Sequence, residues 1–186
     1  MLYDSPVRTA VLGVLTEGPS TPREIIASVK QLAGTVWHPT GDAVLAAIER
    51  AMEAGHLQSV DQATRLELTS AGIECFRGLL ESPWDGSNTV TGRVTVALKI
   101  RFIDVLTPEI ARAVLTDLRQ NHGDAIKILR ADYSKAQRHG LPGIQWIQHE
   151  LERHVWELRW LKTLQPPRRP CTAGGAAIEL AGEVAN

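Results

Sequence analysis

The chain has 186 residues, two cysteines and a formal net charge of −1. Its hydrophobic fraction of 44% suits a buried core and is too high for a disordered chain. Two cysteines cannot build a disulfide scaffold, the N-terminal segment lacks the basic start of a signal peptide, and no apolar run approaches the ~20 residues of a membrane helix. These properties predict a cytoplasmic, helix-rich protein that does not enter membranes, with one large or two small domains.

Charge is distributed unevenly along the chain. Residues 1–82 carry six basic and ten acidic side chains, a net charge of −4, whereas residues 83–164 carry twelve and nine, a net charge of +3. The segment 165–186 balances two basic against two acidic residues. Nucleic-acid-binding surfaces are usually basic, so the net charge of the first segment does not by itself favour DNA binding.

The first 82 residues alternate between helical patterns and turn signals. The expected elements, in order, are a helix over 7–16, a helix from 21, a helix from about 40 to 55, two alternating segments over 56–60 and 64–69, and a helix from 69 to about 80. Thr21, Pro22 and Glu24 match a capping box with proline in the first helical position. Three helices, a hairpin and a fourth helix are typical of a winged helix-turn-helix, with the hairpin as the wing.

The second half of the chain predicts long helices. Residues 83–95 are rich in small polar residues and glycine, which indicates a linker. A short amphipathic stretch over 96–106 precedes Thr107-Pro108-Glu109, which marks the start of a helix that could extend to about 138. A last helix is expected from about 142 to 164, and the proline-led segment 165–186 is expected to be disordered.

The last helix carries an apolar seam. Its positions are Ile144, Ile147, Leu151, Leu158 and Leu161, with His154 in one slot. Two long helices cannot bury all of their apolar surface against each other, and surplus apolar surface usually indicates a partner. We therefore expect a homodimer through the C-terminal helices. The predicted fold is mainly α: a winged helix-turn-helix domain with a small β-hairpin wing over 1–82, a linker over 83–95, a long-helix dimerisation domain over 96–164 and a tail over 165–186.

Short motifs recur in a defined order along residues 7–164. They are VLGVLTEGPS at 11–20, WHPT at 37–40, the stretch from 48 to 57 that ends in EAGHL, RLELTSAG at 65–72, LKIRF at 98–102 and ELRWL at 157–161. Together they resemble the PadR family of bacterial transcriptional regulators. The resemblance implies a dimeric winged-helix repressor whose third helix enters the major groove of double-stranded operator DNA, while the wing contacts the backbone. Some members of that family bind aromatic or drug-like effectors near the dimer interface and release DNA.

The chain departs from the family pattern at positions that face DNA in the family. Gly41-Asp42 stand where the family usually has Pro-Gly, and Leu45-Ala46 replace a usual Tyr-Pro pair. The candidate DNA-facing residues are Arg23, Thr40, Asp42, Arg50, Gln62 and Arg65. The third helix is acidic, which supports an alternative in which a winged-helix dimer has lost specific DNA binding and acts as a protein-interaction module.

The last helix also carries three tryptophans. The candidate residues for an effector site or a dimer interface are Trp146, Leu151, Trp156 and Trp160. One interpretation is an aromatic wall for a flat effector at the dimer interface, and the other is that the indole rings fill the dimer core.

Catalytic and metal-binding motifs are not recognised in the sequence. The segment from His149 to His154 lacks the His-Glu-x-x-His spacing, because Arg153 stands where the second histidine belongs. Histidines five residues apart share a helix face poorly, so we expect no metal site there, with solvated side chains and His154 in the seam. The chain has no phosphate-binding glycine loop, nucleophile elbow or zinc-type cysteine set, so neither an enzyme nor a cofactor is expected.

Overall fold

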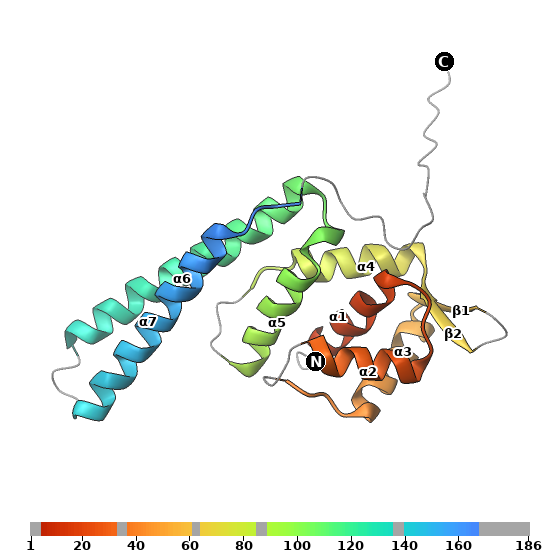
Figure 1. Cartoon of the computed structure of the whole chain (residues 1–186), viewed down its shortest axis with the longest axis horizontal. Helices are drawn as coiled ribbons and strands as arrows, with labels where there is room; N and C mark the ends of the chain where they lie inside the picture. Colours follow the sequence, from red (N-terminus) through yellow and green to blue (C-terminus); the bar gives the residue numbers. More distant parts are fainter. Residues whose placement is uncertain (1–4, 33–36, 61–63, 85–88, 136–139, 168–186) are drawn as a thin grey trace, which may run out of the picture.

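The computed structural model describes residues 5–32, 37–60, 64–84, 89–135 and 140–167. Figure 1 shows a cluster of short helices with a β-hairpin at its outer edge, and two long helices that run side by side away from that cluster. The helix α5 (Val90–Arg101) lies between these two parts. Within the described residues, none of the helices combines the length and apolarity needed to cross a membrane.

The N-terminal part has the predicted order of helices and strands. Its elements are α1 (Ser5–Val14), the 3₁₀ turn η1 (Leu15–Glu17), α2 (Pro22–Leu32), α3 (Gly41–Glu53), β1 (Leu57–Val60), β2 (Arg65–Leu68) and α4 (Ser70–Glu81). The mainly helical fold with a winged helix-turn-helix and a small hairpin is therefore confirmed.

Local side-chain caps fix where two of these helices begin. The backbone N–H of Thr21 donates to Glu24 Oε2 at 2.8 Å, and the Glu24 N–H donates to Thr21 Oγ1 at 3.3 Å, which completes the predicted capping box. Thr40 Oγ1 accepts a hydrogen bond from the Ala43 N–H at 3.2 Å at the start of α3. These bonds satisfy N–H groups that have no partner inside the helix.

The hairpin is tied to the loop before α2. Strands β1 and β2 are antiparallel, with Leu57 opposite Leu68. Leu66 of β2 also exchanges both backbone hydrogen bonds with Ser20, at 2.9 and 3.0 Å. Gly55, with a φ of +70°, reverses the chain after α3 in a conformation that favours glycine. The wing therefore has a fixed position relative to the first turn of α2.

The C-terminal part begins earlier than the sequence predicts. Its elements are α5, the 3₁₀ turn η2 (Ile103–Val105), α6 (Pro108–Lys135) and α7 (Leu141–Thr163). Residues 90–95 were expected in the linker, but they form the first half of α5. Thr89 Oγ1 caps this helix by accepting from the Gly92 N–H at 3.0 Å, and Val94 is buried in the core, which outweighs the loop-like composition. Residues 168–186, most of the predicted tail, lie outside the described residues.

One hydrophobic core joins the two parts at α5. A Cβ at Gly13 of α1 would lie only 2.4 Å from the Phe102 ring, so glycine permits this close approach. Phe102 also packs edge-on against Phe76 of α4, with ring centroids 5.5 Å apart. The buried Lys99 ammonium donates to the carbonyl oxygens of Leu80 and Ser82 at the end of α4. These contacts fix α5 against the winged-helix part.

The helices α6 and α7 form a long antiparallel pair (Figure 1). On α6, Leu118, His122 and Ile126 are spaced four residues apart and all are buried. In the same stretch of α6, the Arg119 guanidinium donates to the carbonyl oxygens of Leu161 at 3.0 Å and Leu164 at 2.9 Å. Arg119 thus satisfies carbonyl groups at the C-terminus of α7.

Candidate functional sites

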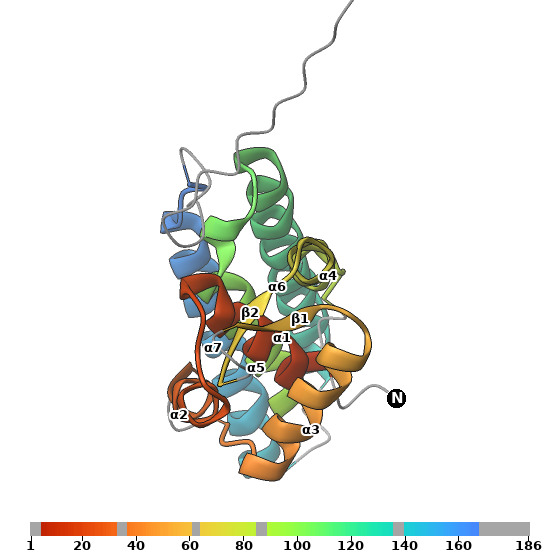
Figure 2. The same ribbon diagram turned by 90° about the vertical axis from the view of Figure 1, so that its right-hand side faces the viewer.

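The solvent-facing side of α3 is acidic and apolar. Figure 2 looks onto the side of the molecule that carries α2, α3 and the hairpin. Along α3, Asp42, Glu49 and Glu53 are exposed, and so are the apolar side chains of Leu45 and Met52. The buried side of the helix carries Val44, Ala47, Ile48 and Ala51. Carboxylates repel phosphate, so this face differs from a basic recognition helix.

One arginine of the wing lies near another in the first turn of α2. Arg23 and Arg65 are both exposed. Arg65 is next to Leu66, whose backbone is hydrogen-bonded to that of Ser20 in the loop before α2. Arg23 lies in the first turn of α2, just after this loop. The pKa of Glu24 in the same turn is lowered, chiefly by its hydrogen bonds from Thr21 and to a smaller extent by the positive charge of Arg65. The tertiary bridge therefore places Arg65 close to the first turn of α2, which carries Arg23.

Two more of the predicted DNA-facing residues, Thr40 and Arg50, are described by the structure. Thr40 is exposed, but its hydroxyl caps α3. Arg50 is exposed and, with Arg8, Ala47 and Ala54, lines a shallow pocket on another side of α3. Gln62 lies outside the described residues.

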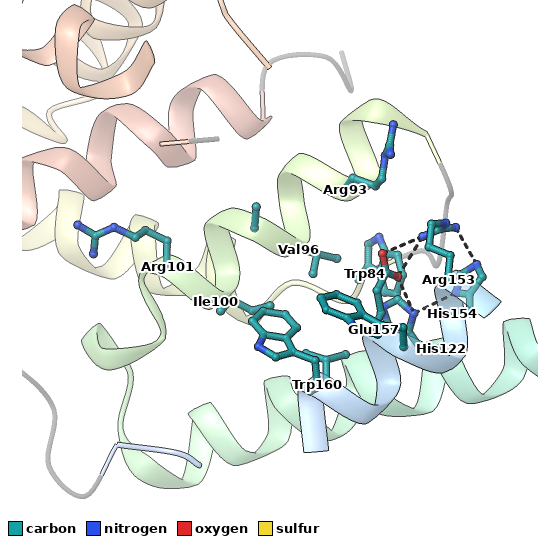
Figure 3. Close-up of a pocket in the computed structure, with 13 residues that line it drawn as sticks. Trp84, Arg93, Val96, Ile100, Arg101, His122, Arg153, His154, Glu157 and Trp160 are labelled. Atoms are coloured by element: carbon teal, nitrogen blue, oxygen red, sulfur yellow. Dashed lines mark hydrogen bonds and ion pairs between the residues drawn. The ribbon is translucent and has the colours of Figure 1, made fainter. Parts of the chain in front are cut away.

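A cavity of about 440 Å³ lies between α5, α6 and α7. Figure 3 shows α5 on one side and the long helices on the other. Its lining residues are Trp84, Arg93, Val96, Ala97, Ile100, Arg101, His122, Arg153, His154, Trp156, Glu157, Trp160 and Leu161. Three indole rings and several aliphatic side chains make the wall largely apolar, and arginines stand at its margins. Its volume lies within the range of about 300–1,000 Å³ that is usual for small-molecule sites.

Trp84 contributes a buried hydrogen-bond donor to this wall. Its side chain is 7% exposed, and among the described residues its indole Nε1 has no hydrogen-bond partner. The ring lies against His122, with centroids 5.1 Å apart. An unpaired buried donor is costly, and this one is covered by the surrounding side chains and is not open to the cavity.

A polar cluster from α6 and α7 forms one end of the cavity (Figure 3). His122 Nδ1 lies 3.0 Å from His154 Nδ1 and 3.3 Å from Glu157 Oε2. Arg153 donates to both oxygens of Glu157 at 3.0 Å and to Glu150 Oε2 at 2.9 Å, and its Nη2 lies 3.0 Å from His154 Nε2. We call His122, Arg153, His154 and Glu157 the His–Glu cluster.

Burial controls the protonation of both histidines in the His–Glu cluster. Their side chains are almost inaccessible, since His122 is 3% and His154 5% exposed. Loss of solvation lowers the pKa of each, and the charge of Arg153 lowers both further, while Glu157 partly opposes the change. Both imidazoles are therefore held neutral near pH 7.

Comparison with known proteins places the chain in a family of regulators. The family model that describes AphA-like transcriptional regulators matches residues 3–165. The chain belongs to this family. Membership confirms the resemblance to PadR-type transcriptional regulators that the sequence motifs indicate.

Solved structures of PadR proteins also match this regulator. Bacillus subtilis PadR in complex with p-coumaric acid is 19% identical, with a TM-score of 0.43, and the match covers 87% of this chain and 94% of that one. The PadR-like regulator of Bacillus cereus is 15% identical, with a TM-score of 0.40 and coverages of 84% and 98%. Bacillus subtilis PadR in complex with operator DNA is 20% identical, with a TM-score of 0.39 and coverages of 83% and 93%. None of the curated proteins matches the chain.

The cavity of this AphA-like regulator brings together only part of the predicted tryptophan set. Trp156 and Trp160 line it, although both remain partly exposed to solvent, whereas Trp146 lies outside the lining, with its ring centroid 5.8 Å from that of His149. Leu151, on the same helix, is half-buried and lies outside the lining.

Two side chains of the His–Glu cluster differ from the sequence-based expectation. Arg153 was expected to be solvated, but its side chain is only 19% exposed because carboxylates one helical turn away on either side, those of Glu150 and Glu157, both bind it. His122 was not recognised as a candidate, because it lies 32 residues from His154. The available signal was a histidine within an apolar helical stripe on α6.

Proposed function

We propose that this regulator binds double-stranded operator DNA as a homodimer and represses transcription by occluding a promoter. The observation that carries DNA binding is the pair formed by Arg65 of the wing and Arg23 of the first turn of α2. Arg23 and Arg65 are exposed, and the Ser20–Leu66 bridge fixes them relative to each other. In this arrangement the arginines bind phosphates on either side of the groove, while α3 meets the base edges with Leu45 and Met52.

Exposed apolar residues on α6 and α7 support the homodimer. Among the described residues of this helix pair, the exposed large hydrophobic side chains are Ile128, Tyr133, Leu141, Trp146, Trp156 and Trp160. Such a concentration is unusual for a surface that remains in water. A second copy of the chain that packs along α7 would bury these rings and set the distance between the two winged-helix parts.

The cavity between α5, α6 and α7 supports a planar aromatic effector. The indole rings of Trp84, Trp156 and Trp160 provide flat apolar contacts, and Arg93 and Arg101 can pair with a negatively charged group. Because α5 also packs against α1, and its Lys99 donates to the carbonyl oxygen of Leu80 in α4, an effector that moved α5 would change the orientation of the winged-helix part. We propose that effector binding weakens operator binding by this route.

The acidic face of α3 supports a second candidate function. Asp42, Glu49 and Glu53 face the solvent where a DNA-reading helix usually presents arginine or amide groups. In this alternative, the winged-helix dimer has lost specific DNA binding and its wing and α3 contact another protein.

A binding titration distinguishes the two functions. Fluorescence anisotropy with the DNA upstream of the protein's own coding region should show saturable binding that weakens steeply with added salt. Arg23→Ala and Arg65→Ala should each weaken binding and lower the salt slope by about one unit. Arg130→Ala is the matched control, because Arg130 is exposed on α6 far from the wing. Salt-insensitive binding, or equal effects of all three substitutions, would favour the protein-interaction alternative.

Tryptophan fluorescence tests the effector cavity separately. Planar aromatic acids should quench the fluorescence saturably, and Trp160→Leu should weaken their binding by removing one wall of the cavity. Trp146→Leu is the control for the loss of an indole that we place in the dimer interface but that does not line the cavity. If no aromatic acid quenches saturably, the effector proposal fails, whatever the DNA titration shows.

A further inference from the structure

The His–Glu cluster has a geometry that hydrogen bonding alone does not explain. The three atoms His122 Nδ1, His154 Nδ1 and Glu157 Oε2 converge, and one ligand atom from each residue lies within 4.8 Å of the others. A tetrahedral ion with bonds of about 2.0–2.1 Å holds its ligand atoms about 3.3 Å apart. The observed separations of 3.0 and 3.3 Å are close to that spacing.

The protons of these groups cannot be placed without a conflict. Arg153 can only donate to His154 Nε2, so neutral His154 carries its hydrogen on Nδ1 and donates to His122 Nδ1. His122 Nδ1 is then an acceptor and faces the Glu157 carboxylate, which is also an acceptor. If His122 Nδ1 carries the hydrogen instead, the N–H groups of His122 and His154 are two donors that face each other. If the hydrogen of His154 is then placed on its Nε2, the His154 Nε2–H group faces the Arg153 donor.

We propose that His122, His154 and Glu157 bind a divalent transition-metal ion, with Zn²⁺ as the best match to two imidazole nitrogens and one carboxylate oxygen. A cation among the three atoms lets all of them act as electron-pair donors, which removes the acceptor–acceptor and donor–donor contacts among them. The inference concerns a site that the proposed DNA and effector functions do not require.

The residues around the cluster suit this role. Glu157 follows His154 by three residues on α7, so both side chains project from one face of the helix. Arg153 binds both oxygens of Glu157, which orients the carboxylate, and second-shell contacts of this kind support metal ligands. Metal binding puts the hydrogen of His154 on Nε2, so the Arg153–His154 contact must open. Arg153 keeps its partners Glu150 and Glu157 when it does.

The site would have an open coordination position. All three ligand residues line the cavity, so a fourth ligand, either water or a donor group of a bound molecule, can approach from that side. Three protein ligands with one open position is the arrangement of exchangeable and reactive zinc sites, whereas structural zinc sites usually have four protein ligands. The metal would therefore be reversibly bound and accessible to small molecules.

Equilibrium dialysis of the full-length protein tests the site. Chelator-treated protein is dialysed against ZnCl₂ and its zinc content is measured by elemental analysis, with one ion per chain expected. His154→Ala and Glu157→Gln should each weaken binding by about 10- to 100-fold or more. His149→Ala is the matched control, since His149 is an exposed histidine on the same helix, and it should leave binding unchanged. Circular dichroism establishes that each variant is folded.

Cobalt substitution keeps the proposal testable if a variant fails to fold. Co²⁺ added to the metal-free wild-type protein should give the intense visible absorption of a four-coordinate site, and Zn²⁺ should displace it. Absence of zinc from the dialysed wild-type protein, a cobalt spectrum like that of the hydrated ion, or binding that is lost only in His149→Ala would overturn the assignment. None of these measurements uses DNA or an aromatic ligand, so their outcome is independent of the proposed function.

Discussion

The winged-helix part and the α6–α7 pair differ in which side chains they bury and which they leave exposed. In the winged-helix part, α1 to α4 each place a stripe of buried residues in one shared core. The α6–α7 pair also adds apolar residues such as Leu118 and Leu161 to that core, but it leaves indole rings exposed and buries the polar residues His122, Glu150 and His154. Most of the exposed large apolar side chains are therefore on the second part, which has the composition of an interface and a ligand site.

This difference predicts that stability depends mainly on the winged-helix part and that recognition depends mainly on the long helix pair. Tight packing around α1 should make the winged-helix part sensitive to added volume and insensitive to the presence of other molecules. The long helix pair should respond to partners, because a second copy, an effector or an ion would supply contacts that a single chain lacks. The predictions that follow test this contrast.

The largest expected effect is on dimerisation. Trp146→Ala removes an indole that is 63% exposed in the single chain and that we expect to be buried by a second copy. The dimer should be weakened by about 2–4 kcal/mol, or roughly 30- to 1,000-fold in dissociation constant. Sedimentation equilibrium measures this change, and Glu152→Ala, an exposed polar position on the same helix, is the control. A wild-type protein that is monomeric at micromolar concentration would refute the dimer.

A pair of glycine substitutions compares packing in the two parts. Gly13→Ala should lower the free energy of unfolding by about 1–3 kcal/mol, because the new Cβ meets the buried Phe102 ring. A Cβ added at Gly123 on α6 would have no neighbour within 4 Å. Gly123→Ala should therefore raise the free energy of unfolding by up to about 1 kcal/mol through helix propensity. Urea denaturation measures both values. Equal destabilisation by the two variants would show that the long helix pair is as tightly packed as the winged-helix part.

A smaller effect is expected on the acidic face of α3. Glu49→Gln and Glu53→Gln each remove an exposed carboxylate, so operator binding should strengthen by a few fold per substitution, about 0.3–1 kcal/mol, at low salt. The anisotropy titration used for the arginine variants measures this gain. Asp132→Asn, an exposed acidic position on α6, is the control. If binding does not change, α3 does not approach the phosphates.

The smallest effect concerns Lys99, where α5 joins the winged-helix part. Burial lowers the pKa of its ammonium group, although the charges of Asp117 and Glu81 partly oppose this. Between that lowered pKa and 10.5, the unfolded chain binds more protons than the folded one, so the free energy of unfolding should rise with pH. Denaturation at several alkaline pH values should show this rise in the wild type but not in Lys99→Met. The same slope in both proteins would contradict the assignment.

Sequence reasoning succeeded where local chemistry decides the structure. The capping box at Thr21 and Glu24, the cap at Thr40 and the turn at Gly55 act within a few residues, and all were recognisable in the sequence. It failed at 90–95, where a segment with a loop-like composition forms a helix because Val94 packs into the core. Of the predicted site residues, the structure brings Trp156 and Trp160 to one cavity and leaves Trp146 outside it.

The sequence by itself determined the order of helices and strands, because hydrophobic periodicity and caps are short-range signals, and its ordered motifs indicated the regulator family. Only the tertiary structure placed Arg65 beside the first turn of α2 and His122 beside His154. Arg65 lies 42 residues after Arg23 in the chain, and His154 lies 32 residues after His122. Which distant side chains meet depends on how whole helices and strands pack, and no local pattern in the sequence encodes it.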